Sequence, residues 1–340
     1  RLLACRPDAV IFKTENAFFN ALNMALIVKQ KSPATVLIGS GTNHSDKGQI
    51  ARWKRDELEC PESSFDYHIL GEDDIVLPEV LSAIGRGTRG ELAERFQMTG
   101  RIIDATAGPH LDNLEELPFY DFTDYDFARY GDPQTIRLNA SRGCIQHCAF
   151  CQDWALGGKY RRMNAERLFE EYRCQHQRHP KILHLQFYDR LLNGDVAVLE
   201  RFCDLLIAEY GAKALSGGGG PPVIWAGDFI IRPEMSDALI EKMARAQCGR
   251  FGTGLESGSE RVRASVFKDF FSNADAARVF ASCRRHGINV AVNIIIGLPA
   301  ETQEDFLQTV RFVETNASNI WELRLTFPTG WKGGSSATPP

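Results

Sequence analysis

The chain has 340 residues, of which 44% are hydrophobic and 24% charged, with a formal net charge of −5. These are ordinary globular values, and the length allows two domains or one large α/β domain with an appendage. The absence of a long basic block argues against a general nucleic-acid coat protein. No stretch reaches the length of a membrane span, no secretory signal opens the chain, and the nine cysteines show no paired framework. We therefore expect a reducing, cytoplasmic location.

Residues 1–87 alternate between strand and helix patterns. Strands are predicted at 8–12, 35–39 and 65–72, and helices at 16–31 and 75–85. Such alternation favours a parallel sheet with crossover helices, as in part of a doubly wound, Rossmann-like domain. Residues 88–134 have weaker periodicity and are predicted to form a linker.

Residues 135–328 again alternate, and a low-complexity tail at 329–340 is predicted to be disordered. Strands are predicted at 135–139, 182–187, 223–227, 250–255, 289–296 and 319–325. Helices are predicted at 165–178, 196–210, 236–246, 274–286 and 304–315. Six β/α units predict a partial (β/α)6 TIM-type barrel, with function at the carboxyl ends of its strands.

Three cysteines lie within eight residues, directly after the first predicted barrel strand. Cys144, Cys148 and Cys151 have the spacing C-x3-C-x2-C. A cubane iron–sulfur cluster usually takes four cysteine ligands, so three leave one iron with an open coordination position, where chemistry can take place. The alternative is a structural zinc site with Cys174 or His147 as the fourth ligand.

The cysteine loop and its position resemble the signature of the radical S-adenosylmethionine (SAM) superfamily. Residues 254–259 (Gly-Leu-Glu-Ser-Gly-Ser) and 296–302 (Ile-Gly-Leu-Pro-Ala-Glu-Thr) are similar to segments found in the cobalamin-associated and methylthiotransferase-like branches. The resemblance implies a [4Fe-4S] cluster on the three cysteines and SAM on the open iron. It also implies reductive cleavage of SAM to a 5′-deoxyadenosyl radical that abstracts hydrogen from a substrate.

Under this resemblance, six further residues are candidates for SAM binding. They are Phe150, Asp189, Arg232, Glu256, Ser257 and Gly297. Each has a structural alternative. Phe150 can be a packing residue, Glu256 and Ser257 can serve the cap of the next helix, and Gly297 can serve a turn before Pro299. Asp189 can pair with Arg190, and Arg232 can form a surface salt bridge.

Residues 7–10, 36–41 and 65–74 resemble the second half of the cobalamin-binding domain that is fused to many of these enzymes. The first strand of such a domain is absent, as is the loop where a D-x-H-x-x-G cobalt-ligand motif would sit. The resemblance therefore implies an N-terminally truncated domain, with cobalamin possible in the full-length parent.

The expected function is methylation or rearrangement of a small-molecule substrate by a cobalamin-dependent methyltransferase or an oxidative cyclase-like enzyme. An electron donor such as flavodoxin or ferredoxin is the expected partner, and nucleic acid is not expected. A tRNA methylthiotransferase is one alternative, but only Cys5 and Cys60 lie upstream, where those enzymes carry three further cluster cysteines. The other alternative is a non-catalytic, zinc-stabilised binding module.

Overall fold

A computed structural model describes residues 5–13, 18–41, 65–105, 110–151, 159–216 and 223–327. The chain divides into two compact units, residues 1–112 with 155–157 and residues 113–154 with 158–340. The tail predicted at 329–340 lies outside the described residues. None of the helices in the described ranges is both long enough and apolar enough to cross a bilayer.

The first unit contains a five-stranded sheet in the order β1-β2-β3-β5-β4. Its strands are β1 (Ala9–Lys13), β2 (Val36–Gly41), β3 (Tyr67–Leu70), β4 (Met98–Thr99) and β5 (Ile102–Asp104). All neighbours pair in parallel except β4, which is antiparallel to β5. β4 and β5 lie in the segment predicted as a linker. They are too short to show a two-residue hydrophobic period, so the sequence pattern did not reveal them.

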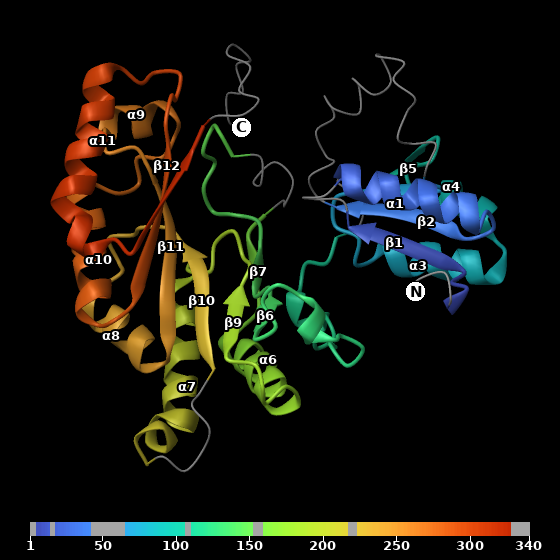
Figure 1. The fold of residues 1–340 in the computed structure, drawn as a ribbon, viewed down its shortest axis with the longest axis horizontal. Helices are drawn as coiled ribbons and strands as arrows, with labels where there is room; N and C mark the ends of the chain where they lie inside the picture. Colours follow the sequence, from blue (N-terminus) through green and yellow to red (C-terminus); the bar gives the residue numbers. More distant parts are fainter. Residues whose placement is uncertain are drawn as a thin grey trace. The chain divides into compact units, whose positions relative to one another are not determined.

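Helices cover both faces of this sheet (Figure 1). They are α1 (Phe18–Lys31), α3 (Val76–Arg86) and the short η4 (Arg89–Glu91) and α4 (Leu92–Arg95). Ala25 and Val28 of α1 pack with Val10 and Leu37. The helix α3 packs in a second cluster with Ile38, which is the residue next to Leu37 on β2. Because adjacent strand residues face opposite sides, these two clusters lie on opposite faces, as predicted for a doubly wound arrangement.

The second unit is built on a six-stranded, fully parallel sheet in the order β13-β12-β11-β10-β9-β6. Its strands are β6 (Thr135–Leu138), β9 (His184–Phe187), β10 (Ile224–Phe229), β11 (Cys248–Glu256), β12 (Asn289–Ile295) and β13 (Glu322–Thr326). All six coincide with predicted strands. The spatial order follows the chain order and β6 is not paired with β13, so the sheet is an open, partial barrel.

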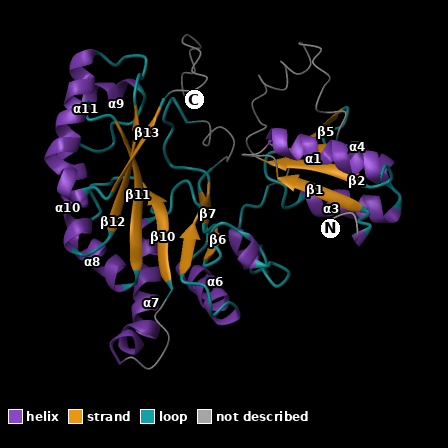
Figure 2. Cartoon of the chain, in the orientation of Figure 1, coloured by secondary structure: helices purple, strands orange, loops and turns teal. Residues whose placement is uncertain are grey.

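Helices follow the strands and lie along one side of this sheet (Figure 2). They are α6 (Ala165–Arg178), α7 (Val196–Ser216), α8 (Asp237–Arg245), α9 (Glu260–Ser265), α10 (Asn273–Arg285) and α11 (Gln303–Asn316). Short 3-10 turns complete the unit at Leu114–Glu116, Phe127–Arg129 and Ala317–Asn319. The helix α9 and a small antiparallel pair, β7 (Ser141–Arg142) with β8 (Arg161–Arg162), were not predicted, because each is shorter than the window that periodicity needs.

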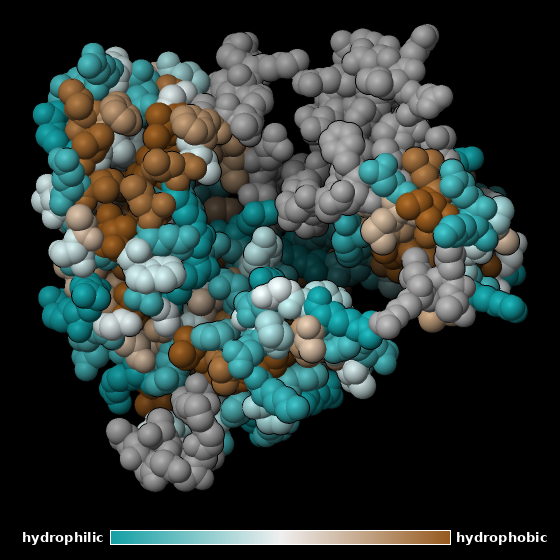
Figure 3. Space-filling view, in the orientation of Figure 1, coloured by the Kyte–Doolittle hydropathy of each residue, from teal (hydrophilic) through white to brown (hydrophobic). Residues whose placement is uncertain are grey.

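The strands of the second unit have an apolar outer face and a polar inner face. Phe187, Trp225 and Phe251 are fully buried in the core between sheet and helices. The residues beside them, such as Gln186 and Arg250, therefore point to the inner face. On β13 the apolar side chains Leu323 and Leu325 remain exposed, and Figure 3 shows apolar atoms gathered over this region and α11. A polar inner face is unlike the filled core of a closed barrel, and it leaves that face available for a ligand.

Candidate functional site

The three cysteines lie on a loop that begins just after β6; we call residues 143–151 the cysteine loop. Gly143 opens it with a φ of 75°, a left-handed backbone conformation that favours glycine. The amide of Ala149 donates to the carbonyl of Val266 at 2.9 Å, and the amide of Cys151 donates to the carbonyl of Cys148 at 3.0 Å. Because strands of a parallel sheet share one carboxyl edge, the loop lies at the edge where β11 also ends.

Asp189 holds the base of this loop. Its carboxylate accepts hydrogen bonds from the backbone amide of Ala140 at 2.9 and 3.1 Å, from the amide of Ser141, and from the Ser141 hydroxyl at 2.6 Å. The side chain is buried, and burial raises its pKa to about 6 despite these hydrogen bonds. Asp189 thus positions the backbone that leads into the cysteine loop, rather than pairing with Arg190 on a solvated surface.

The raised pKa of Asp189 predicts that the free energy of unfolding depends on pH. Since the folded pKa of about 6 lies above the unfolded value of 3.8, the stabilisation from Asp189 is fully present below about pH 4 and falls as the pH rises to about 6. The loss amounts to about 3 kcal/mol. The neighbouring Tyr120 and Tyr160 have raised pKa values and stay neutral in this range.

Urea unfolding of the cluster-free protein, followed by tryptophan fluorescence between pH 4 and 7, measures this loss. Asp189→Asn is the matched variant, because its side chain does not titrate. The free energy of unfolding of the wild type should therefore decline relative to the variant across this window. Parallel curves would contradict the assignment.

Glu256 ends β11 in an unusual conformation. Its φ of 64° is left-handed, and the pairing of β11 with β12 shifts register between Gly254 and Glu256. A non-glycine residue in this region costs about 1–3 kcal/mol, and such strain gathers at functional sites. The carboxylate is held by Lys268, whose Nζ lies 2.8 Å from Oε1, and both side chains are more than 90% buried. The bulge thus aims a buried ion pair at the carboxyl edge.

Lys268 connects this ion pair to the cysteine loop. Its Nζ lies 5.7 Å from the centre of the Phe150 ring. Burial raises the pKa of the Cys148 thiol to about 11, and the Lys268 cation opposes that shift. Phe150 packs against Val262 and Val266. The carbonyl of Val266 also accepts the hydrogen bond from the Ala149 amide of the cysteine loop. Cys148, Phe150, Glu256 and Lys268 therefore form one neighbourhood.

The donor set of the cysteine loop suits an iron–sulfur cluster. The backbone amide of Gln146 lies 3.4 Å from Cys144 Sγ, the kind of contact that stabilises a ligating thiolate. Among the described residues, no three His, Cys, Asp or Glu side chains lie together as they would around a single metal ion. A cubane binds its cysteines through different iron atoms, so its ligands are spaced more widely than those of one zinc ion.

Ser257 and the residues after it fasten the end of β11 to α11. The Ser257 hydroxyl lies 3.1 Å from that of Thr309, and it accepts from the Ser259 amide at 3.1 Å. Ser259 is the N-cap of α9, accepting from the amide of Val262. A Cβ at position 258 would lie 2.6 Å from the Thr309 Cα, so only glycine fits. Ser259 therefore caps α9, and Ser257 joins the end of β11 to α11.

The last two candidates have intramolecular partners. Arg232 donates from Nη1 to the carbonyls of Asn193 and Gly194 at 3.1 and 3.0 Å, and its Nη2 lies 3.2 Å from Glu234. Gly297 has a φ of 85°, and its amide donates to the Glu301 carboxylate at 2.6 Å. Nothing lies within 4 Å of where its Cβ would be, which leaves the backbone accessible to a ligand.

Sequence reasoning missed Lys268 and Arg263. Arg263 is fully buried and donates to the Ser257 carbonyl and the Asn273 side chain, both at 2.7 Å. Its own carbonyl accepts from the amide of Lys268 at 2.9 Å, so it holds both ends of the Glu256–Lys268 segment. The sequence offered only a weak sign of the ion pair. Lys268 stands among apolar residues, twelve positions after Glu256 at the end of the strand.

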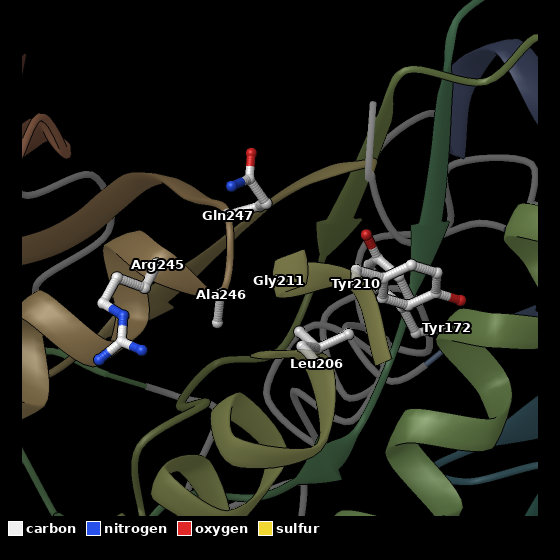
Figure 4. A pocket seen from close by; sticks show the side chains of 7 residues that line it. All are labelled: Tyr172, Leu206, Tyr210, Gly211, Arg245, Ala246 and Gln247. Carbon is white, nitrogen blue, oxygen red and sulfur yellow. The ribbon is translucent and has the colours of Figure 1, made fainter. Parts of the chain in front are cut away.

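A pocket lies at the opposite, amino end of β11 (Figure 4). Its lining residues are Tyr172, Leu206, Tyr210, Gly211, Arg245, Ala246 and Gln247. None of the predicted site residues lines it. In the first unit, Asp66–Gly71 matches the letters D-x-H-x-x-G. His68 lies on strand β3 and packs against Gly39 and Phe65, rather than in a loop after a first strand.

The comparison with known families decides the family. The family profile described as the radical SAM superfamily matches residues 138–313, which is just over half of the chain. The chain belongs to the radical SAM superfamily. The matched range begins in β6 and contains the cysteine loop and β9 to β12. The predicted family is confirmed, and a [4Fe-4S] cluster and SAM are the cofactors that this family implies.

Individual proteins show the same likeness. The uncharacterized methyltransferase PH0819 of Pyrococcus horikoshii is 24% identical over 319 residues, covering 91% of this chain and 64% of the relative. The ribosomal protein uS12 methylthiotransferase RimO of Pelotomaculum thermopropionicum is 27% identical, covering 70% of this chain and 51% of the relative. The chain thus spans between about half and just under two thirds of the length of these relatives.

A solved structure has a similar fold. The radical SAM methyltransferase TsrM of Kitasatospora setae, with cobalamin and a [4Fe-4S] cluster bound, matches with a TM-score of 0.65 at 16% identity, over 94% of this chain and 63% of that chain. The likeness confirms the predicted α/β fold class.

Proposed function

We propose that this chain binds a [4Fe-4S] cluster through Cys144, Cys148 and Cys151 and uses it to cleave SAM. When bound, the cluster supplies one electron to the sulfonium of SAM, which releases a 5′-deoxyadenosyl radical for hydrogen abstraction. The observation that carries the proposal is the meeting of the cysteine loop with the buried Glu256–Lys268 pair at the carboxyl edge of the sheet. The names of two relatives favour methylation as the outcome, and we propose a small molecule as the substrate.

The residues of the chain orient the cofactors and exclude water. Glu256 is the proposed acceptor for a ribose hydroxyl or the amino group of SAM, while Lys268 fixes the direction of its carboxylate. The backbone at Phe150 and at Gly297 is proposed to lie along the adenine and the rest of SAM. Asp189, Ser257 and Arg232 have their hydrogen bonds inside the protein, so we assign them the positioning of the surrounding loops.

The proposed electron donor is flavodoxin or ferredoxin, because a SAM-cleaving cluster needs a low-potential reductant. We do not extend cobalamin binding to this chain. TsrM carries cobalamin, and that cofactor is assigned to that protein alone.

Anaerobic reconstitution with iron and sulfide, followed by reduction in the presence of SAM, tests the proposal. Chromatographic detection of 5′-deoxyadenosine is the expected result. Protein that contains a full cluster but forms no 5′-deoxyadenosine with dithionite, flavodoxin or ferredoxin would show that the proposed function is wrong.

The role of Glu256 leads to a separate prediction. Glu256→Gln keeps the shape and a hydrogen bond to Lys268 but removes the negative charge. SAM affinity should fall by about 1–3 kcal/mol while iron content stays normal, since no cysteine is changed. Calorimetric titration of the reconstituted protein with SAM measures this. Unchanged affinity would limit Glu256 to a structural role.

A further inference from the structure

The sheet of the second unit ends at a strand with a row of exposed apolar side chains. In and beside β13, apolar residues stand at every second position, each between 41% and 67% exposed: Trp321, Leu323, Leu325 and Phe327. Val292 and Ile294 of β12, which pair with Leu323 and Leu325, are buried. Among the described residues, the buried apolar layer between sheet and helices therefore stops at β12, and the row on β13 extends it into solvent (Figure 3).

The backbone of β13 is also open on one side. β13 stands at the end of the strand order, and in the described part of the chain it pairs with β12 alone. An edge of this kind presents N–H and C=O groups to a further strand. A strand that brings its own apolar row is favoured there, because pairing removes both rows from water.

The charged side chains of β13 restrict which strand can pair with it. Glu322 and Arg324 alternate with the apolar row, so they lie on the other face of the strand. Hydrogen bonds of 2.8 and 2.7 Å join them, and their side chains are 35% and 43% exposed. Charges on an edge strand usually prevent pairing, since most partners would leave them unmatched or opposite a like charge. A strand that fits must therefore carry an acid and a base at the same spacing.

A second copy of β13 meets this requirement in one antiparallel register. With a twofold axis at Leu323, Glu322 of each copy lies opposite Arg324 of the other, and Leu323 lies opposite its own equivalent. The same register brings Trp321 opposite Leu325. An axis at Glu322 or at Arg324 would instead set two glutamates or two arginines opposite each other, which is destabilising. The charges thus select the register that joins the apolar rows.

We propose that the chain forms a twofold dimer through antiparallel pairing of β13 with β13 of a second copy. The interface is isologous and closed, because each copy contributes the same strand and that edge is then used up. The inference does not depend on SAM cleavage, since neither the cysteine loop nor the Glu256–Lys268 pair takes part in it. The charged pairs set the register, and the apolar row supplies the buried surface.

Sedimentation velocity of the anaerobically reconstituted full chain tests the proposal. One short strand from each copy makes a small interface, so the mass should rise with protein concentration, from 38.0 kDa to twice that value and no further. Glu322→Arg and Arg324→Glu each set like charges opposite one another, and each should raise the dimer dissociation constant by about tenfold or more. Mixing these two variants should restore association, because every arginine of one then lies opposite a glutamate of the other.

Glu166→Arg and Arg201→Glu are the matched controls. Their exposed ion pair lies on α6 and α7, which follow β6 and β9 at the other end of the strand order. Both should dimerise like the wild type. Leu323→Lys is a second interface variant, which sets like charges at the axis and leaves Glu322 and Arg324 in place; it should also weaken the dimer.

Several results would overturn the proposal. A monomer at every concentration would mean that another segment or another protein covers the edge. Assembly beyond a dimer would mean that a different, open contact joins the copies. A dimer that Glu322→Arg and Leu323→Lys leave unchanged would lie elsewhere on the surface. Folded Glu322→Arg and Arg324→Glu proteins that do not associate on mixing would exclude the register.

Discussion

Cys148→Ala should reduce iron and sulfide in the anaerobically reconstituted protein to background and abolish 5′-deoxyadenosine formation. Two thiolates cannot hold a cubane, and the loop supplies no replacement ligand at the required spacing. Cys148 is the most informative of the three cysteines because it is buried, 7% exposed, and lies next to Lys268 and Glu256. Cys144→Ala and Cys151→Ala should have the same effect. Iron and sulfide assays with the visible absorption spectrum are the measurements.

Cys203→Ala is the matched control for this prediction. Cys203 is a fully buried thiol in the core, on α7. Its replacement removes a cysteine of similar burial but leaves the cysteine loop intact, so iron content should stay normal. A Cys148→Ala protein with full iron and sulfide would contradict the assignment. A colourless wild-type protein with one bound zinc would favour the zinc-stabilised binding module instead.

Lys268→Met should lower the free energy of unfolding by about 3–5 kcal/mol. The change removes the cation and leaves the Glu256 carboxylate buried beside an apolar side chain, where it has lost its 2.8 Å partner. An uncompensated buried charge costs far more than a lost surface ion pair. Urea unfolding of the cluster-free protein, followed by tryptophan fluorescence, measures the loss.

The double variant Glu256→Gln/Lys268→Met isolates the pair. It contains neither charge, so most of the stability lost in Lys268→Met should return. Glu166→Gln provides a comparison, because Glu166 and Arg201 form a surface pair with side chains 59% and 56% exposed. Its effect should be small, because an exposed ion pair is solvated by water and contributes little to stability. A Lys268→Met effect as small as that of Glu166→Gln would mean that water reaches the pair.

Several parts of this protein follow from local sequence patterns. The alternation of strand-like apolar segments with helical periods predicts all six strands of the second unit and five of its helices, because a strand buried on its helix side carries apolar residues at every second position. The C-x3-C-x2-C spacing after β6 likewise predicts the cysteine loop, since neighbouring ligands on one loop are a local property. Elements shorter than one period, such as β5 and α9, were not predictable in this way.

The partners of the site side chains depend on the folded chain. Glu256 meets Lys268 because a bulge gives residue 256 a left-handed backbone and Arg263 anchors the following turn, and no spacing rule encodes either event. Asp189 reaches back across 48 residues to the amide of Ser141 and so supports the backbone that leads into the cysteine loop. The side chains of Asp228 on β10 and Arg250 on β11 lie 3.6 Å apart, and only the order of the sheet brings these two strands together. Such contacts arise from the packing of distant segments, so the residue types were visible in the sequence but their partners were not.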